Sequence, residues 1–276
     1  MNIKSHHKVT HEDYVLHEVE ALEGRETFDS GANKPLLIRG IIKQTGEKGD
    51  FLVKFNAAER MNPTACCFEY IGACMAKELG LLPAEPVIIE ITQDFVDQSV
   101  GKDWWGMANK SKGDNYGCYF VEGGRNFPKG EPLSAQQYRE AQNIFAFDVF
   151  LINPDRRDEK QNMITDGKNI LIFDHELAFG FIFELFNNNS TPWIISEVDK
   201  NWVKKHYFYP YLKGNDVEFG SFVDKFVNLD ARFWSKIEEN IPDIWKVEHI
   251  KTIRNRTEEF IKNKDLFTEE LKKIVA

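Results

Sequence analysis

The sequence predicts an α+β fold whose first part is rich in strands and whose second part is mainly helical. Short runs of β-branched and aromatic residues, separated by turn residues, fill the chain as far as Glu122. The segment "GGRNFPKGEP" at 123–132 then interrupts any regular element, and beyond it apolar residues recur at three- and four-residue steps. We therefore place an internal boundary at 123–132.

Composition limits the classes of function. The 276 residues are 42% apolar, which suits a substantial core, and 44 acidic against 35 basic residues disfavour nucleic-acid binding. The four cysteines contain no Cys-x-x-Cys pair, so we expect reduced thiols and no zinc site. No apolar run is long enough to cross a bilayer and the start lacks a signal-like segment, so we expect a cytoplasmic protein without membrane contact.

In the first part, "LLIRGII" (36–42) and "DFLVKF" (50–55) flank a polar loop and predict a β-hairpin. Asn62 and Pro63 then supply a helix cap and a first helical residue, and the apolar residues that follow predict one amphipathic helix ending near Gly80. "PVIIEI" and "GCYFVE" (117–122) are expected to be further strands.

In the second part, Ser134 and Gln137 form a capping-box pattern that begins a helix leading to Asn153. From Phe222 onward the pattern is that of amphipathic helices, with a break at Pro242.

Between these helices, "NMIT" and "NILIFD" flank Asp166-Gly167 and predict a tight hairpin that brings Asn162 close to Asp174. Amide and carboxylate oxygens placed in this way suit Mg²⁺. Asp155 lies in the loop before the hairpin, where a carboxylate can act as a base over the same site, as phosphoryl transfer requires. Taken alone, the segment is equally compatible with a polar surface loop followed by an ordinary hairpin.

Support comes from Lys54, which projects from a strand on the face opposite Phe51 and Val53. Glu69, near the start of the next helix, is the carboxylate that could hold this ammonium against nucleotide phosphates. Found alone, Lys54 would be an ordinary edge-strand lysine and Glu69 a surface glutamate.

A small-residue turn, Gly31, Ala32 and Asn33, precedes the first predicted strand and could let backbone N–H groups approach phosphate. Gly31 is equally compatible with a simple turn. No Gly-x-x-x-x-Gly-Lys-[Ser/Thr] element occurs in the chain, which argues against the P-loop class of nucleotide binders.

Together these residues resemble the HipA-like kinases, in particular the smaller branch that lacks the extra N-terminal subdomain of HipA, and more distantly the phosphatidylinositol and protein kinases. The resemblance covers most of the chain. It runs through "SGANKPLLI", "FLVKF", "FEYIGACMAKELGLLPAEPVIIEI", "YGCYFVEGG", "NPDRRDEKQN" and "LIFDHELAF".

The resemblance implies a two-lobed protein-kinase-like fold. A β-rich N-lobe with one main helix (1–122), a hinge (123–132) and a mainly helical C-lobe (133–276) would form a single HipA-like kinase domain. It also implies the site roles. Asp155 would be the catalytic residue, Asn162 and Asp174 the Mg²⁺ ligands, Lys54 the phosphate-binding lysine and Glu69 its partner, and the phosphate loop would contain Gly31, Ala32 and Asn33. Adenine would meet the backbone of Tyr119, Phe120, Val121 and Glu122.

The catalytic loop departs from the family pattern. In protein kinases and HipA the amide ligand follows the catalytic Asp by five residues, whereas position 160 here is Lys and the asparagine before the hairpin is Asn162. His175 stands where protein kinases carry Phe, and we expect a structural role for it. Arg156 and Arg157 could contact phosphate or pair with neighbouring acids, and Asp148 is expected to accept loop backbone N–H groups.

The expected function is an ATP- and Mg²⁺-dependent kinase that transfers the γ-phosphate to a hydroxyl group, with Ser or Thr of a protein as the default acceptor. Alternatives are a pseudokinase that binds nucleotide or a partner protein, a kinase of lipids or small molecules, and transfer of AMP. The sequence identifies neither the acceptor nor any regulatory protein partner.

Overall fold

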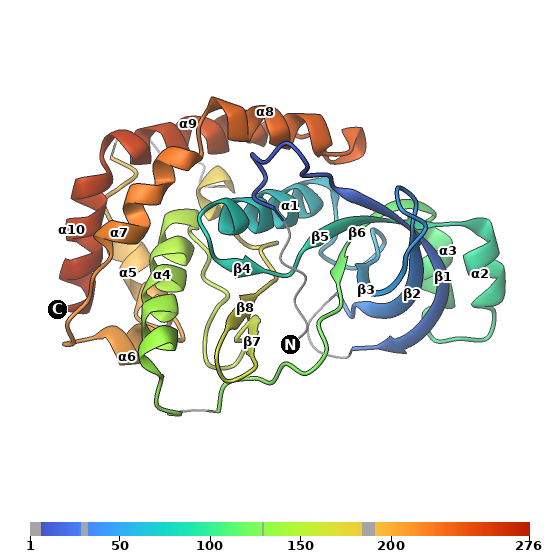
Figure 1. The fold of residues 1–276 in the computed structure, drawn as a ribbon, viewed down its shortest axis with the longest axis horizontal. Helices are drawn as coiled ribbons and strands as arrows, with labels where there is room; N and C mark the ends of the chain where they lie inside the picture. Colours follow the sequence, from blue (N-terminus) through green and yellow to red (C-terminus); the bar gives the residue numbers. More distant parts are fainter. Residues whose placement is uncertain (1–6, 29–32, 129, 184–190) are drawn as a thin grey trace.

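The computed structural model describes residues 7–28, 33–128, 130–183 and 191–276. The predicted α+β organisation is confirmed, because most strands come from the first part of the chain and most helices from the second (Figure 1). Two apolar clusters lie within the described residues. One fills the interior of the first part, and the other surrounds α1 (Pro63–Glu78), α4 (Ala135–Leu151) and the C-terminal helices.

Five strands of the first part close into a small barrel with the order β1-β2-β3-β6-β5. They are β1 (His17–Thr27), β2 (Leu36–Ile42), β3 (Lys48–Lys54), β5 (Pro86–Ile91) and β6 (Gly113–Tyr119). Alternate side chains such as Ile38, Phe51 and Ile89 fill its interior. The β2–β3 hairpin is antiparallel, as predicted, and β1 closes the barrel by pairing parallel to β5.

Two features of this barrel differ from the prediction. β1 was not expected, because its glutamates disguise an alternating strand in which Val19 and Ala21 point inward. β6 begins at Gly113 and ends at Tyr119 instead of spanning 117–122, since the polar start of the strand resembles a turn. Its buried Asn115 is satisfied by the carbonyls of Ser111 and Gly113.

Helix α1 (Pro63–Glu78) begins as predicted, with the Asn62 side chain accepting the Ala65 N–H at 2.9 Å. The expectation of an amphipathic helix is wrong, because every residue from Ala65 to Glu78 is buried. Figure 1 shows the reason: α1 runs between the barrel strands and the C-terminal helices, so both sides are covered. Its charged side chains are paired, as in the 2.5 Å contact of Lys77 with Glu85.

The second part begins with α4 (Ala135–Leu151), whose capping box between Ser134 and Gln137 is confirmed. The predicted hairpin is also confirmed as β7 (Met163–Thr165) and β8 (Ile170–Ile172), joined by a four-residue turn. β8 pairs parallel with β4 (Leu82–Pro83), so the chain after α1 is joined directly to the hairpin.

The remaining helices are α2 (Gln93–Gln98), α3 (Trp105–Lys110), α5 (Glu197–Val203), α6 (Tyr209–Leu212), α7 (Gly220–Val223), α8 (Ala231–Asn240), α9 (His249–Lys262) and α10 (Lys264–Val275), with 3₁₀ turns η1 (Gly180–Phe183), η2 (Asp224–Asn228) and η3 (Asp243–Trp245). The expected break at Pro242 falls between α8 and α9. Across the described part of the chain, no helix combines the length and apolarity that crossing a bilayer requires.

A buried carboxylate at the end of α4 organises the loop that follows. Asp148 accepts hydrogen bonds from the Asn153 amide at 2.8 Å, from Nε of Arg156 at 2.6 Å and from Nε2 of His206 at 2.9 Å. Nε2 of His206 carries the proton, because its Nδ1 accepts the Phe208 N–H. The partners are therefore side chains and not the loop backbone N–H groups that we predicted.

Arg156 extends this network toward the hairpin. Its guanidinium also donates to the Asn162 carbonyl, so one buried cation joins α4 to the far end of the loop. Burial raises the pKa of Asp148, but the charge of Arg156 and the hydrogen bond from His206 outweigh it and hold that pKa below its usual range. The pair is therefore ionised and completely shielded from water.

We expect Asp148→Asn to lower the free energy of unfolding by about 3–5 kcal/mol at neutral pH, because the buried guanidinium of Arg156 loses its counter-charge. A depressed pKa stabilises the fold above the ordinary carboxyl pKa and loses that contribution as pH falls. The difference between wild type and variant should therefore shrink below about pH 4. Urea unfolding at several pH values measures it.

The control is Asp103→Asn, at an exposed position, which should change the free energy of unfolding by less than about 0.5 kcal/mol. Equal effects of the two substitutions at neutral pH would contradict the role assigned to Asp148.

Candidate functional site

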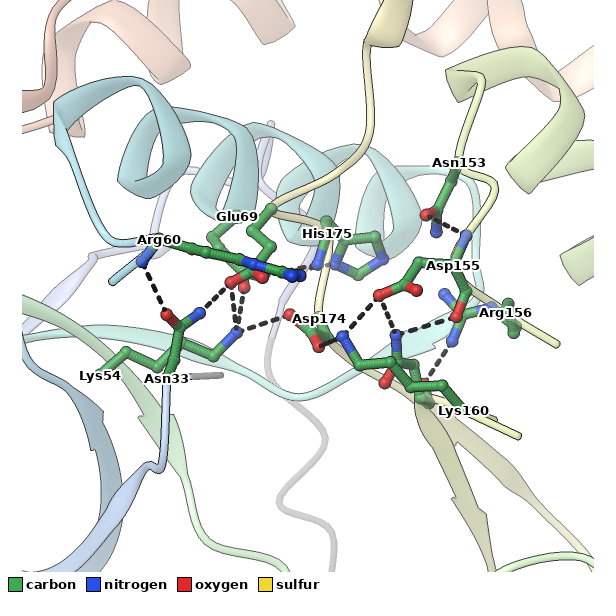
Figure 2. A network of polar contacts seen from close by, with 12 residues as sticks. Asn33, Lys54, Arg60, Glu69, Asn153, Asp155, Arg156, Lys160, Asp174 and His175 are labelled. Carbon is green, nitrogen blue, oxygen red and sulfur yellow. Dashed lines mark hydrogen bonds and ion pairs between the residues drawn. The ribbon is translucent and has the colours of Figure 1, made fainter. Parts of the chain in front are cut away.

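Lys54, at the end of β3, turns away from the barrel interior and meets three carboxylates. Nζ is hydrogen-bonded to Glu69 of α1, lies 2.7 Å from Oδ1 of Asp174 and 3.7 Å from Glu176 (Figure 2). Phe51 and Val53 occupy the opposite face, as the alternation predicts. The sequence-based pairing of Lys54 with Glu69 is therefore present, and it belongs to a larger cluster.

The lysine and the carboxylates of this cluster differ in how burial and neighbouring charges shift their pKa values. Burial lowers the pKa of Lys54, but the surrounding carboxylates raise it more, so the ammonium stays protonated. Burial raises the pKa of Glu69 and Lys54 offsets only part of that effect. Glu69 is also held by the His175 N–H at 2.8 Å. The cluster thus carries more acidic than basic groups.

Asn162 and Asp174 lie at the open end of the β7–β8 hairpin. Both have left-handed backbone, with φ of 49° and 64°, a conformation that Asn and Asp tolerate better than most residues. The Phe173 N–H donates to the Asn162 carbonyl at 3.0 Å, so Asp174 is one residue beyond the position opposite Asn162. The hairpin therefore brings the two predicted metal ligands together.

Asp155 joins them through two donors. The Asn162 amide lies 3.2 Å from its Oδ2, and Nζ of Lys160 lies 2.5 Å from the same oxygen and 2.9 Å from Oδ2 of Asp174. Burial raises the pKa of Asp174, but the charges of Lys54 and Lys160 lower this pKa by more than burial raises it. The carboxyl group is therefore ionised. Among the described residues no donor is found at Oδ1 of Asp155, and that oxygen faces no competing hydrogen bond.

The predicted phosphate loop is described only at its last residue. Gly31 and Ala32 lie outside the described residues. The Asn33 amide donates to Glu176, and its oxygen accepts the Arg60 N–H at 3.2 Å. Asn33 therefore lies beside the Lys54 cluster (Figure 2).

The segment expected to meet adenine is partly committed to other bonds. The Tyr119 N–H donates to the Glu85 carbonyl and the Phe120 N–H donates to the Asp50 carbonyl, each at 3.0 Å. These two N–H groups keep the end of β6 against its neighbours. A base bound here would therefore take its backbone N–H contact from Val121 or Glu122.

Sequence reasoning assigned no role in the site to Lys160 or Glu176 and left the role of Arg156 open. Lys160 stands at the position where related kinases carry an amide, and this substitution was the available signal. Glu176 follows Asp174 by two residues, beyond the end of β8, and its place beside Lys54 depends on the left-handed backbone at Asp174. Arg156 could not be placed, since its partner Asp148 lies eight residues earlier in a helix.

His175 has the structural role expected of it. It is buried, its ring meets Phe147 edge to face, and burial together with nearby Arg156 lowers its pKa to about 3. A Cβ on Gly72 would lie 2.7 Å from the His175 Cβ, so α1 can approach this residue only with glycine at that position.

The donor set suits a hard divalent cation. Carboxylate oxygens of Glu69, Asp174 and Glu176 lie within 4.8 Å of one another. The Asn162 amide is hydrogen-bonded to Asp155, which Lys160 links to Asp174. Oxygen donors of this kind, with an ionised Asp174 among them, match the preference of Mg²⁺.

A comparison with curated proteins found no match. A sequence model of the family described as HipA-like kinase matches residues 26–269, which include every described site residue discussed above. The match covers the barrel strands β2, β3, β5 and β6, together with α1, the loop before the hairpin and most of the C-terminal helices. The chain therefore belongs to the HipA-like kinase family.

Proposed function

We propose that this protein transfers the γ-phosphate of Mg-ATP to a hydroxyl group, with Ser or Thr of a protein as the default acceptor. One observation carries the proposal: Asp155, Asn162 and Asp174 meet around Lys160, while Lys54 joins Asp174 to Glu69. A base, oxygen ligands and cations in contact are the parts that phosphoryl transfer uses.

In this reaction Oδ1 of Asp155 receives the proton of the acceptor hydroxyl, because Oδ2 is already held by Asn162 and Lys160. The hydroxyl oxygen forms a bond to the γ-phosphorus. The bond from that phosphorus to the β–γ bridging oxygen breaks, and its electron pair leaves with ADP. Asp155 thus orients the nucleophile and takes up one proton per turnover.

The remaining residues position the nucleotide. Lys54, kept in place by Glu69, exchanges part of its contact with Asp174 for phosphate oxygens. Asp174 and Asn162, with Glu176 beside Lys54, would hold Mg²⁺, which when bound neutralises phosphate charge. The backbone at Val121 and Glu122 would meet adenine. In this arrangement residues 1–122 and 133–276 act as two lobes joined by 123–132.

A second candidate function is nucleotide binding without turnover. The observation that favours it is the contact of Lys160 with Asp155, because the ammonium already occupies one oxygen of the carboxylate that would meet the acceptor hydroxyl. Transfer of labelled phosphate separates the two functions.

We expect Asp155→Asn to reduce γ-phosphate transfer by about 10²–10⁴-fold, since the amide cannot accept the hydroxyl proton. Purified protein is incubated with Mg-ATP labelled at the γ-phosphate and a generic protein acceptor, and label in protein is counted. The same assay with ATP labelled at the α-phosphate tests transfer of AMP.

The matched control is Asp158→Asn, at an exposed position three residues along the same loop, which should transfer label like the wild type. Wild-type transfer by Asp155→Asn would remove Asp155 from its role. Binding of Mg-ATP by the wild type without any transfer would favour the second candidate function.

We expect Lys54→Met to weaken binding of Mg-ATP at least about tenfold, because a charge-assisted hydrogen bond to phosphate is lost. Calorimetric titration measures the affinity directly. This readout is preferable to a melting temperature, since the substitution also leaves buried carboxylates without their cation. Lys48→Met, at the exposed end of the same strand, is the control. Unchanged affinity in Lys54→Met would place the phosphates elsewhere.

A further inference from the structure

We propose, building on the phosphotransfer function above, that Lys160 is a catalytic residue that contacts the transferring γ-phosphate. Lys160 lies between Asp155 and Asn162 in the sequence, and its ammonium introduces a positive charge beside Asp174, a proposed metal ligand. The inference rests on the position of this charge, on the anchoring of the loop that presents it and on its access to solvent.

The position follows from the two carboxylates that Lys160 joins. Nζ lies 2.5 Å from Asp155 and 2.9 Å from Oδ2 of Asp174, while Lys54 takes Oδ1 of Asp174 from the other side (Figure 2). The acceptor hydroxyl meets Asp155 and the phosphates meet Asp174, so the phosphoryl group passes between these carboxylates. Lys160 thus lies between the two carboxylates that border this path, and Lys54 contacts the other oxygen of Asp174.

The loop holds Lys160 in this position from both sides. Arg157 and Lys160 exchange two backbone hydrogen bonds of 3.0 Å each, which closes a tight turn. The next residue, Gln161, receives the Phe127 N–H at 2.9 Å and donates to the Phe127 carbonyl at 2.8 Å. The two residues by which this loop exceeds that of related kinases are therefore folded into a turn that presents Lys160.

Lys160 also remains open to a ligand. Its side chain is 27% exposed, whereas the side chain of Asp155 is 7% exposed. An ammonium that is bonded to two carboxylates yet reached by solvent can exchange one of those bonds for a phosphate oxygen. Such a donor stabilises the charge on the phosphoryl oxygens while the bond to the leaving ADP breaks, and it keeps its own proton throughout.

The alternative role for the same contacts is obstruction. If Lys160 blocked the ligand-free site and had to withdraw, its removal would speed turnover and strengthen nucleotide binding. If it were only part of the fold, its removal would affect ATP and ADP equally. The two measurements below separate these roles from contact with the γ-phosphate.

The test compares wild type, Lys160→Met and Lys160→Gln. The control is Lys168→Met, at an exposed lysine in the turn between β7 and β8. We expect the neutral variants to transfer γ-phosphate about 100-fold more slowly, as when one transition-state donor is lost. In calorimetry with Mg²⁺, their affinity for a non-hydrolysable ATP analogue should fall about tenfold, and their affinity for ADP should stay within about twofold.

Transfer at the wild-type rate or faster in Lys160→Met, or equal losses of affinity for the ATP analogue and ADP, would overturn the inference. If that variant does not fold, as judged by circular dichroism, Lys160→Gln decides, because its amide can still donate to Asp155. The inference alone fails when wild type transfers phosphate, Asp155→Asn does not, and Lys160→Met transfers at the wild-type rate or faster. Absence of transfer by the wild type would defeat the proposed function and this inference together.

Discussion

The buried ammonium of Lys54 is the constraint on which the site depends. A charge in this position needs partners, and it obtains them from α1 through Glu69 and from the chain after β8 through Asp174. The barrel, the central helix and the hairpin are thereby joined at one atom, although Lys54 and Asp174 are 120 positions apart in the sequence. The burial of α1 from Ala65 to Glu78 accompanies this contact, because Glu69 reaches Lys54 from a helix that packs on the barrel on one side and is covered by the C-terminal part on the other.

A second buried ion pair fixes the loop that contains Asp155. Asp148 and Arg156 are both inaccessible to solvent, and they position the backbone on either side of Asp155 without contacting it. One network fixes the loop, and a separate network is left to contact a ligand. The inner pair is shielded and rigid, while Asp155, Lys160 and Asp174 form a partly exposed set whose bonds can be exchanged for those of a ligand. Buried ion pairs add little net stability, so specifying one loop geometry is the better explanation for this one.

Much of this could be predicted from the sequence because the signals are local. The β2–β3 hairpin, the cap of α1, the capping box of α4 and the β7–β8 turn each depend on residues only a few positions apart. The features that were not predicted depend on partners that are distant in the sequence. Strand β1 needs β5 to cover its inner face, and α1 is buried all round only because elements from both parts of the chain surround it. Among the site residues, Lys54 and Glu69 were predicted together, whereas Glu176 and Arg156 acquire meaning only from contacts that no local pattern encodes.

The balance of charge explains why such a site would need a metal as well as lysines. Lys54 and Lys160 are two ammonium groups in contact with four carboxylates, those of Asp155, Glu69, Asp174 and Glu176. These six groups include more acidic than basic side chains, and the pKa of Glu69 is raised first by burial and then in part by the neighbouring charge of Asp174. A nucleotide triphosphate adds further negative charge and would be repelled unless a divalent cation accompanied it. Each lysine can then turn from carboxylate to phosphate only as the cation takes over the carboxylate that the lysine leaves, so binding of metal and of nucleotide would be coupled through Asp174.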